Sequence, residues 1–295
     1  MPITEVPAGG LGSAITPEAW GAYVLQHLSA ASVVLASGAT RIDTALRAVH
    51  VPRVVADGGA SWYSELETID ENGPDGDELV LVPKKVATLT RLSNEVVDDS
   101  SPSVLDTVGT AMVNSVALTA DRAILTGAGG KAPVGVYGQA GQQVTGAVTI
   151  DSLIDAAGLV ADVGGQARVA YVNPANHTGL MKEKDANDRP LLTPDYSGGP
   201  SSTIYGMSIW ATKGIAVDTA LVCDPTQIIV AVRSDPTVAV STDALFTSDG
   251  AVCRVIARID AGVNDPNGLV AISADAPAGT QASRSSDSGT RSAKK

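Results

Sequence analysis

The sequence KKVATLTRLSNEVVDDS occupies residues 84–100 and continues directly into SPSVLDTVGTAMVNSVALTADRAILTG over residues 101–127. The first stretch is rich in β-branched and apolar residues and predicts a strand over residues 86–97 with a basic start. The second stretch opens with Ser101 and Pro102, which are residue types common at helix starts. A strand followed at once by a long helix is the best-defined feature of the chain.

The predicted helix has favourable residues at both of its ends. Asp98 and Asp99 lie where carboxylates stabilise the positive N-terminus of a helix, and Gly127 lies where a C-terminal cap is expected. Apolar residues recur every three to four positions, which makes one apolar stripe. The stripe consists of Leu105, Val108, Met112, Val116 and Ile124.

A cluster of acidic residues precedes this strand, with no basic residue among them. The cluster consists of Glu65, Glu67, Asp70, Glu71, Asp75, Asp77 and Glu78. Alternating residues at 62–67 and 78–82 flank turn-forming residues at 72–76, which predicts a two-stranded hairpin. A hairpin with so few apolar residues is only marginally stable in isolation. It therefore needs a surface to lie against.

Three interpretations of the acidic tip compete. A calcium loop is the weakest, because Pro74 takes its fifth position and Asp75 takes the place of the required glycine. A solvated loop and an electrostatic contact with a basic partner surface remain, and we favour the contact.

The composition excludes several classes of protein. The chain has 295 residues, 44% of them apolar and 18% charged, so it can bury a core. No apolar run approaches the roughly 18–20 residues that cross a bilayer, and the first 38 residues lack the basic and apolar regions of a signal peptide. We therefore expect no membrane contact and a protein that stays in the cytosol. The net charge of −12 argues against wrapping duplex DNA on a basic face.

Catalytic and cofactor motifs are not found. His27, His50 and His177 stand far apart, which gives neither a zinc helix nor an obvious base. The glycines after the long helix hint at a phosphate loop, but Ala132 stands where Ser or Thr is needed. Cys223 and Cys253 stand in apolar, strand-like surroundings and are expected to be buried, reduced thiols. The sequence predicts no enzyme, no cofactor and no metal.

The rest of the chain divides by composition. A Gly-rich arm precedes residue 40, with a short helix opened by Thr16 and Pro17. Helices alternate with short strands after residue 127, which predicts an α/β lobe, and the last 20 residues have the composition of a disordered tail. The predicted helices of the lobe cover 151–163 and begin at 174, and its strands cover 169–172, 204–212 and 221–223. Strands are also predicted at 228–232, 237–240 and 253–259.

This arrangement resembles the major capsid protein of tailed bacteriophages, the Johnson fold, also called HK-ninety-seven-like. The likeness is strongest over residues 84–100 and continues at 121–127 and 133–136, and it covers about residues 40–275. It implies an α+β fold whose parts follow the family pattern. Those parts are an N-terminal arm (1–39), the P domain (40–58, 83–126 with the spine helix, and 227–263 with long strands), an extended E-loop (59–82), an α/β A domain (127–226 with a return at 264–275) and a C-terminal tail (276–295).

The resemblance also implies a function. Such proteins assemble into icosahedral shells of hexamers and pentamers that enclose double-stranded DNA, with portal, scaffold and decoration proteins as further partners. The shell forms in the cytoplasm of the bacterial host. The acidic E-loop would lie across a basic surface of a neighbouring subunit, for which the candidates are Arg53, Lys84, Lys85, Arg91 and Arg258. The tail cations Arg284, Arg291, Lys294 and Lys295 would contact DNA or an acidic neighbour.

Two departures from the family pattern matter. No lysine occurs between Trp62 and Leu81, so the isopeptide cross-link of some family members is not expected. The chain also enters its arm directly from Met1, so either a separate scaffold protein assists assembly or this is a processed form. Bacterial encapsulins, which share the fold and enclose enzymes, are the nearest alternative, and a soluble enzyme with an unrecognised site is a remote one.

Overall fold

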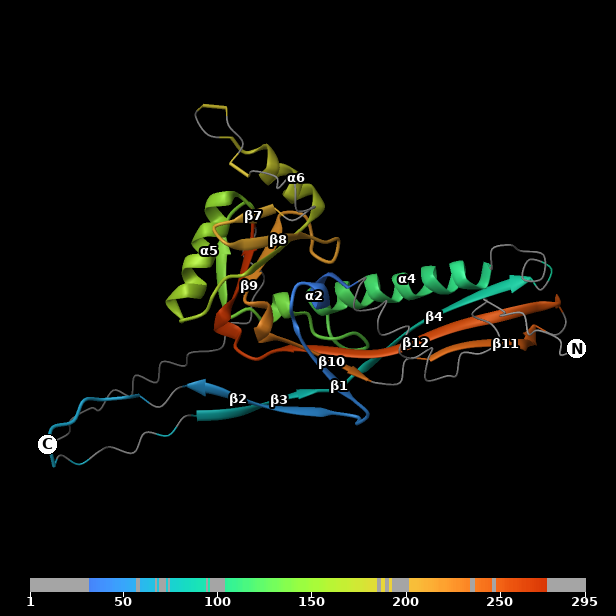
Figure 1. Ribbon diagram of the computed structural model, residues 1–295, viewed down its shortest axis with the longest axis horizontal. Helices are drawn as coiled ribbons and strands as arrows, with labels where there is room; N and C mark the ends of the chain where they lie inside the picture. Colours follow the sequence, from blue (N-terminus) through green and yellow to red (C-terminus); the bar gives the residue numbers. More distant parts are fainter. Residues whose placement is uncertain are drawn as a thin grey trace, which may run out of the picture.

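The computed structural model describes residues 32–56, 59–66, 68, 73, 75–93, 95, 104–184, 187–188, 191–192, 202–233, 237–245 and 248–274. The helix predicted at Thr16 and the tail 276–295 lie outside these residues. A lobe of helices and short strands sits on a long helix-and-sheet body, and a hairpin projects away from that body (Figure 1).

The long body is built on a five-stranded sheet. Its strands are β1 (Thr40–Thr44), β4 (Lys84–Ser93), β10 (Ile228–Arg233), β11 (Thr237–Leu245) and β12 (Gly250–Val263). The longest strand, β12, is central, because it pairs antiparallel with β4 along one edge and with β11 and β10 along the other. β1 runs parallel to β10, so a segment near the start of the chain completes a sheet made mostly of its last third.

One face of this sheet is covered by α4 (Val104–Thr126). The predicted apolar stripe is confirmed where side chains are described: Met112, Val116 and Ile124 are buried. Alternate residues of β12, such as Cys253 and Val255, are buried in the same core, as the two-residue period of a strand requires. The helix ends at Thr126, as predicted, and the strand before it covers Lys84–Ser93, while residues 94 and 96–97 of the predicted strand lie outside the described residues.

The projecting hairpin pairs different strands from those predicted. Its strands are β2 (Val49–Ala56) and β3 (Asp75–Leu81), whereas the described residues at 59–66 contain no strand. The prediction of a first strand at 62–67 was therefore wrong. The true partner includes Val49 and Val51, which pack at the hairpin root near Ile229. Tertiary burial of these valines outweighs the local alternation further along the chain.

The lobe contains a six-stranded sheet in the order β5-β13-β9-β6-β8-β7. These strands are β5 (Gln142–Thr145), β6 (Val169–Val172), β7 (Ser202–Ile204), β8 (Met207–Ala211), β9 (Thr219–Cys223) and β13 (Leu269–Ser273). Helices α5 (Ile150–Asp162) and α6 (Pro174–Lys182) pack with it, as predicted. The single strand predicted over 204–212 is instead two paired strands, because Tyr205 and Gly206 adopt positive φ angles and make a turn.

β13 returns to the lobe from the end of the long body and pairs with β5 and β9. Short 3₁₀ helices at Val136–Gln139, Pro225–Gln227 and Pro266–Gly268 join elements of the lobe and body, and a short α-helix, α2, covers Val33–Ala36. The predicted α+β class is confirmed. Among the described residues, no helix has both the length and the apolar character needed to span a bilayer.

Candidate subunit interface

The exposed face of the five-stranded sheet carries a row of cations. Arg258 lies directly opposite Lys85, and Arg254 lies opposite Leu89, in the register of β12 against β4. Residues in direct register share a face, and the alternate residues of β12 are buried under α4, so these side chains lie on the face away from the helix. Arg91 follows Leu89 by two residues and lies on the same face. We call Lys85, Arg91, Arg254 and Arg258 the basic row.

The structure thus brings together three of the five predicted basic residues and adds Arg254. The predicted set contained Arg258 but not Arg254. Its signal was available, since Arg254 and Arg258 are four positions apart on one strand and therefore share a face. Leu89, 57% exposed, lies within the row and gives it an apolar centre.

Lys84 has a different position from the basic row. It lies opposite the buried Ile259, on the helix side of the sheet. Its Nζ donates a 2.7 Å hydrogen bond to the carbonyl oxygen of Ala132. Lys84 therefore ties the first residue of β4 to the turn that follows α4.

Arg53 is already paired within its own hairpin. Its guanidinium donates to the carboxylate of Asp77, with Nη2 at 2.5 Å and Nε at 3.2 Å from Oδ2. These hydrogen bonds, together with the backbone N–H of Glu78, hold the pKa of Asp77 below its ordinary value. His50 makes a second cross-strand contact, 2.8 Å from Glu78. Arg53 therefore partly neutralises Asp77 inside the hairpin that carries both residues, and Glu78 has a cross-strand partner there as well.

The tip of the hairpin is the most exposed apolar part of the described chain. Trp62 and Leu66 are fully exposed, and Glu65 beside them is exposed as well. A buried or well-packed Trp is the rule in a folded protein, so a fully exposed one marks a contact surface. Glu67, Asp70, Glu71, the side chain of Asp75 and the tail cations Arg284, Arg291, Lys294 and Lys295 lie outside the described residues and side chains.

The root of the hairpin is packed tightly on the sheet. Leu79 and Leu81 lie so close to Gly262 of β12 that a Cβ atom there would come within 3.0 and 2.8 Å of their side chains. Because Gly262 has no side chain, the hairpin can sit directly on the strand backbone. The direction in which the tip projects is therefore set by packing at the root.

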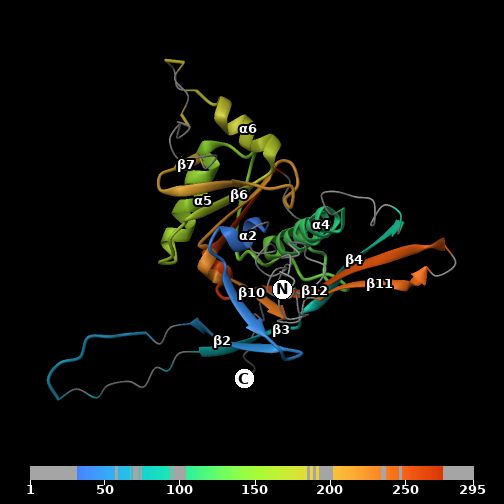
Figure 2. The same ribbon diagram turned by 45° about the vertical axis from the view of Figure 1, so that its right-hand side comes forward.

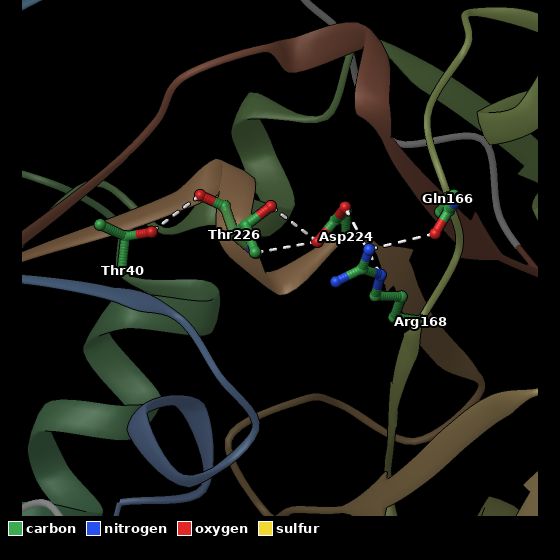
Figure 3. Close-up of polar contacts among 5 residues, drawn as sticks. All are labelled: Thr40, Gln166, Arg168, Asp224 and Thr226. Atoms are coloured by element: carbon green, nitrogen blue, oxygen red, sulfur yellow. Dashed lines mark hydrogen bonds and ion pairs between the residues drawn. The ribbon is translucent and has the colours of Figure 1, made fainter.

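Two further sets of polar contacts connect the body with the lobe and with the start of the described chain. Asp224 accepts hydrogen bonds from the backbone and hydroxyl of Thr226, whose carbonyl accepts from Thr40 at 3.0 Å (Figure 3). Arg168 of the lobe lies 4.0 Å from Asp224 and donates to Gln166. This chain of contacts connects β1 of the body with the lobe sheet.

The start of the described chain is held by Asp121 of α4. The Asp121 carboxylate accepts hydrogen bonds from the Ser32 hydroxyl at 2.5 Å and the Val33 N–H at 2.7 Å. Burial raises the pKa of Asp121, and these hydrogen bonds oppose the rise. The Ser37 hydroxyl bonds to Tyr171 of the lobe, so α2 connects the helix of the body with the lobe.

A metal-binding cluster is not seen in the described part of the chain. No three His, Cys, Asp or Glu side chains there are grouped to hold a metal ion. His50 lies on the hairpin, and His177 lies on α6, where burial lowers its pKa. What the geometry offers is a set of contact surfaces.

Comparison with known proteins agrees with this geometry. The sequence model of the Phage capsid family matches residues 12–274. Among solved structures, a chain of Microbacterium phage Oxtober96 is 19% identical with a TM-score of 0.69, over 92% of this chain and 96% of that chain. A chain of Mycobacterium phage Bobi is 22% identical with a TM-score of 0.66, over 93% and 96%. A chain described as the capsid of an empty GTA particle is 15% identical with a TM-score of 0.66, also over 93% and 96%.

No curated protein sequence matches the chain. The structural neighbours share the α+β architecture over nearly their whole length, which confirms the Johnson-type fold. The family match covers most of the chain, including the hairpin, the long helix and the central strand. The chain belongs to the phage capsid family and is a structural capsid protein.

Proposed function

We propose that this capsid protein assembles into hexamers and pentamers that close an icosahedral phage head around double-stranded DNA. In this assembly residues 59–82 act as the E-loop, and the body and the lobe act as the P and A domains with the boundaries predicted above. The shell is assembled in the cytoplasm of a bacterial host, with scaffold, portal and decoration proteins as further partners.

One observation carries the proposal: the hairpin stands clear of its own subunit. Figures 1 and 2 show it projecting from the body in both views. A two-stranded hairpin is marginally stable alone, and this one exposes Trp62 and Leu66 to water. A neighbouring copy supplies the surface that the hairpin lacks.

Charge complementarity supports an overlap in which the hairpin tip of one copy lies on the sheet of another. The tip is acidic, and the basic row lies on the open face of the sheet in every copy. Opposite charges on two parts of one chain favour contact between copies despite a net charge of −12. That net charge also suits a container that must not grip its genome, and the tail cations provide local contacts with DNA or with an acidic neighbour.

The test is assembly of the purified chain, followed by sedimentation and negative-stain electron microscopy. We expect closed particles, and a protein that stays a monomer or small oligomer under all assembly conditions would overturn the proposal. Particles that hold a second protein and no nucleic acid in cells would favour an encapsulin instead, an alternative that the comparisons with phage and GTA capsids do not favour.

Charge-reversal variants test the electrostatic part. Arg254→Glu with Lys85→Glu should leave the subunit folded and weaken assembly, and so should reversal of Glu65, Glu67, Asp70 and Glu71 together. Lys182→Glu, on the exposed face of α6, is the matched control and should assemble normally. Normal yield and normal salt resistance in both reversed proteins would remove the electrostatic role.

A further inference from the structure

A small apolar pocket opens between α4 and β4. Its walls are Val86 and Ile259 from the sheet, Ala120 and Ala123 from the helix, and Pro133 from the turn after the helix. The pocket has a volume of 140 Å³. Small-molecule sites usually hold roughly 300–1,000 Å³, so this pocket suits a single large side chain better than a cofactor.

The pocket combines its apolar walls with positive charge. Lys84 lies on the helix side of the sheet and lines the pocket, and its hydrogen bond to Ala132 holds this cation in place. The small side chains of Ala120 and Ala123 leave the space open on the helix side. A fitting occupant therefore has an aromatic or aliphatic body and a carboxylate close to it.

The hairpin tip has this chemistry. Trp62 is fully exposed, and Glu65 is exposed three residues later. Trp is the residue type most enriched at the energetic centres of protein interfaces, where it fills a desolvated pocket. A lysine near its ring adds a cation–π attraction.

The occupant must come from another copy. β3 pairs with β2 along its whole length, and its seven residues, at roughly 3.3 Å each, carry the tip about 20 Å from the root. The pocket lies close to that root, because Lys84 follows Leu81 by three residues. The tip cannot reach the pocket of its own subunit without breaking the β2–β3 ladder.

We infer that the pocket between α4 and β4 receives Trp62 of a neighbouring copy, with Glu65 of that copy facing Lys84. The inference rests on the proposed function, since it needs subunits that overlap. It deepens that function by placing an apolar anchor, rather than the acidic residues alone, at the centre of the contact.

Substitution at both sides of the contact tests the anchor. Trp62→Ala should raise the subunit concentration needed for shell formation by at least about tenfold, and Trp62→Phe should lie between this variant and the wild type. Ala123→Leu fills the pocket and should have the effect of Trp62→Ala. The controls are Leu46→Ala, another exposed apolar residue, and Ala111→Leu, the same substitution at an exposed site on α4; both should assemble like the wild type.

Cross-linking tests directly whether the hairpin tip of one copy lies at the pocket of another. Ser61→Cys and Thr119→Cys place thiols beside the tip and beside the pocket, at exposed positions. A short bis-maleimide should link the double variant into chains of subunits in assembled particles, while either single variant should give at most dimers. Circular dichroism of each variant establishes that it is folded before assembly is scored.

The outcomes separate the two proposals. If the wild type never forms particles, the proposed function fails. If particles form, Trp62→Ala assembles at the wild-type concentration and no cross-link appears, the anchor inference alone is overturned. If Trp62→Ala weakens assembly but Ala123→Leu does not and no cross-link appears, Trp62 binds elsewhere and the pocket assignment is overturned.

Discussion

The backbone N–H of Val82 donates a 2.7 Å hydrogen bond to Oδ2 of Asp260, at the point where the projecting hairpin passes into the sheet. Asp260 is only 8% exposed, and its other oxygen accepts the N–H of Ala261 at 3.0 Å. Val82 lies between the end of β3 and the start of β4, where no ladder partner is available to it. The carboxylate therefore supplies the acceptor that the chain needs where it leaves the hairpin.

Removal of this acceptor should loosen the root of the hairpin. Asp260→Ala removes the acceptor of this part-buried hydrogen bond, which should lower the free energy of unfolding by about 0.5–1.5 kcal/mol. Denaturant unfolding of the unassembled subunit measures the loss. Asp260→Asn keeps an acceptor oxygen and should lose less, and equal losses in the two variants would contradict this role of the hydrogen bond.

The same residue makes stability depend on pH. Burial raises the pKa of Asp260 above its ordinary value of 3.8, while hydrogen bonds from Val82 and Ala261 and the charge of Lys84 oppose the rise. Because the folded pKa is the higher one, the stabilising contribution is fully present below pH 3.8 and is lost as the pH rises through the folded pKa. The stability of the wild type relative to Asp260→Asn should therefore fall as the pH rises above 3.8. A relative stability that rises with pH would contradict the direction of the shift.

Two substitutions in and next to helix α5 should change the free energy of unfolding in opposite directions. Thr149 and Ser152 form a reciprocal capping box, so Thr149→Ala should lower the free energy of unfolding by about 0.5–2 kcal/mol. Gly158 lies inside the same helix, and a Cβ atom there would meet nothing within 4 Å. Gly158→Ala should raise the free energy of unfolding by about 0.5–1 kcal/mol. Thermal unfolding compares the two, and a melting temperature lowered by Gly158→Ala would contradict the open space at that site.

The two thiols should be unreactive in the folded protein. Cys223 is fully buried and Cys253 is 6% exposed, and burial raises the pKa of both thiols. A thiol-specific reagent at pH 7.5 should therefore modify neither residue before unfolding and both after denaturation. Rapid labelling of the native subunit would contradict this expectation, and mass spectrometry identifies the modified residue.

Several elements were predicted from the sequence because their signals are local. The apolar stripe of Met112, Val116 and Ile124 and the residues around position 127 placed α4 within a few residues of its observed bounds. The apolar runs at 228–232 and 253–259 likewise placed the cores of β10 and β12. Such patterns depend on the spacing of neighbouring residues, which the chain order contains directly.

The pairing of the hairpin was not predicted, because pairing depends on distant contacts. Alternation at 62–67 looked like a strand, yet Val49 and Val51 occupy the strand that pairs with β3, where Ile229 and Ala231 of β10 bury the root. The destination of Arg53 was missed for the same reason. Only the observed register places it opposite Asp77.

The sequence by itself determined the order of strand and helix over residues 84–126, the acidic character of the hairpin and the family to which the chain belongs. Only the tertiary structure decided which cations share a surface and where an apolar pocket opens. Lys85 and Arg258 are far apart in the chain and meet through the register of β4 against β12, and the walls of the pocket come from three separate segments. The physical reason is that local spacing sets secondary structure, whereas a surface or a pocket exists only after burial has brought distant segments together.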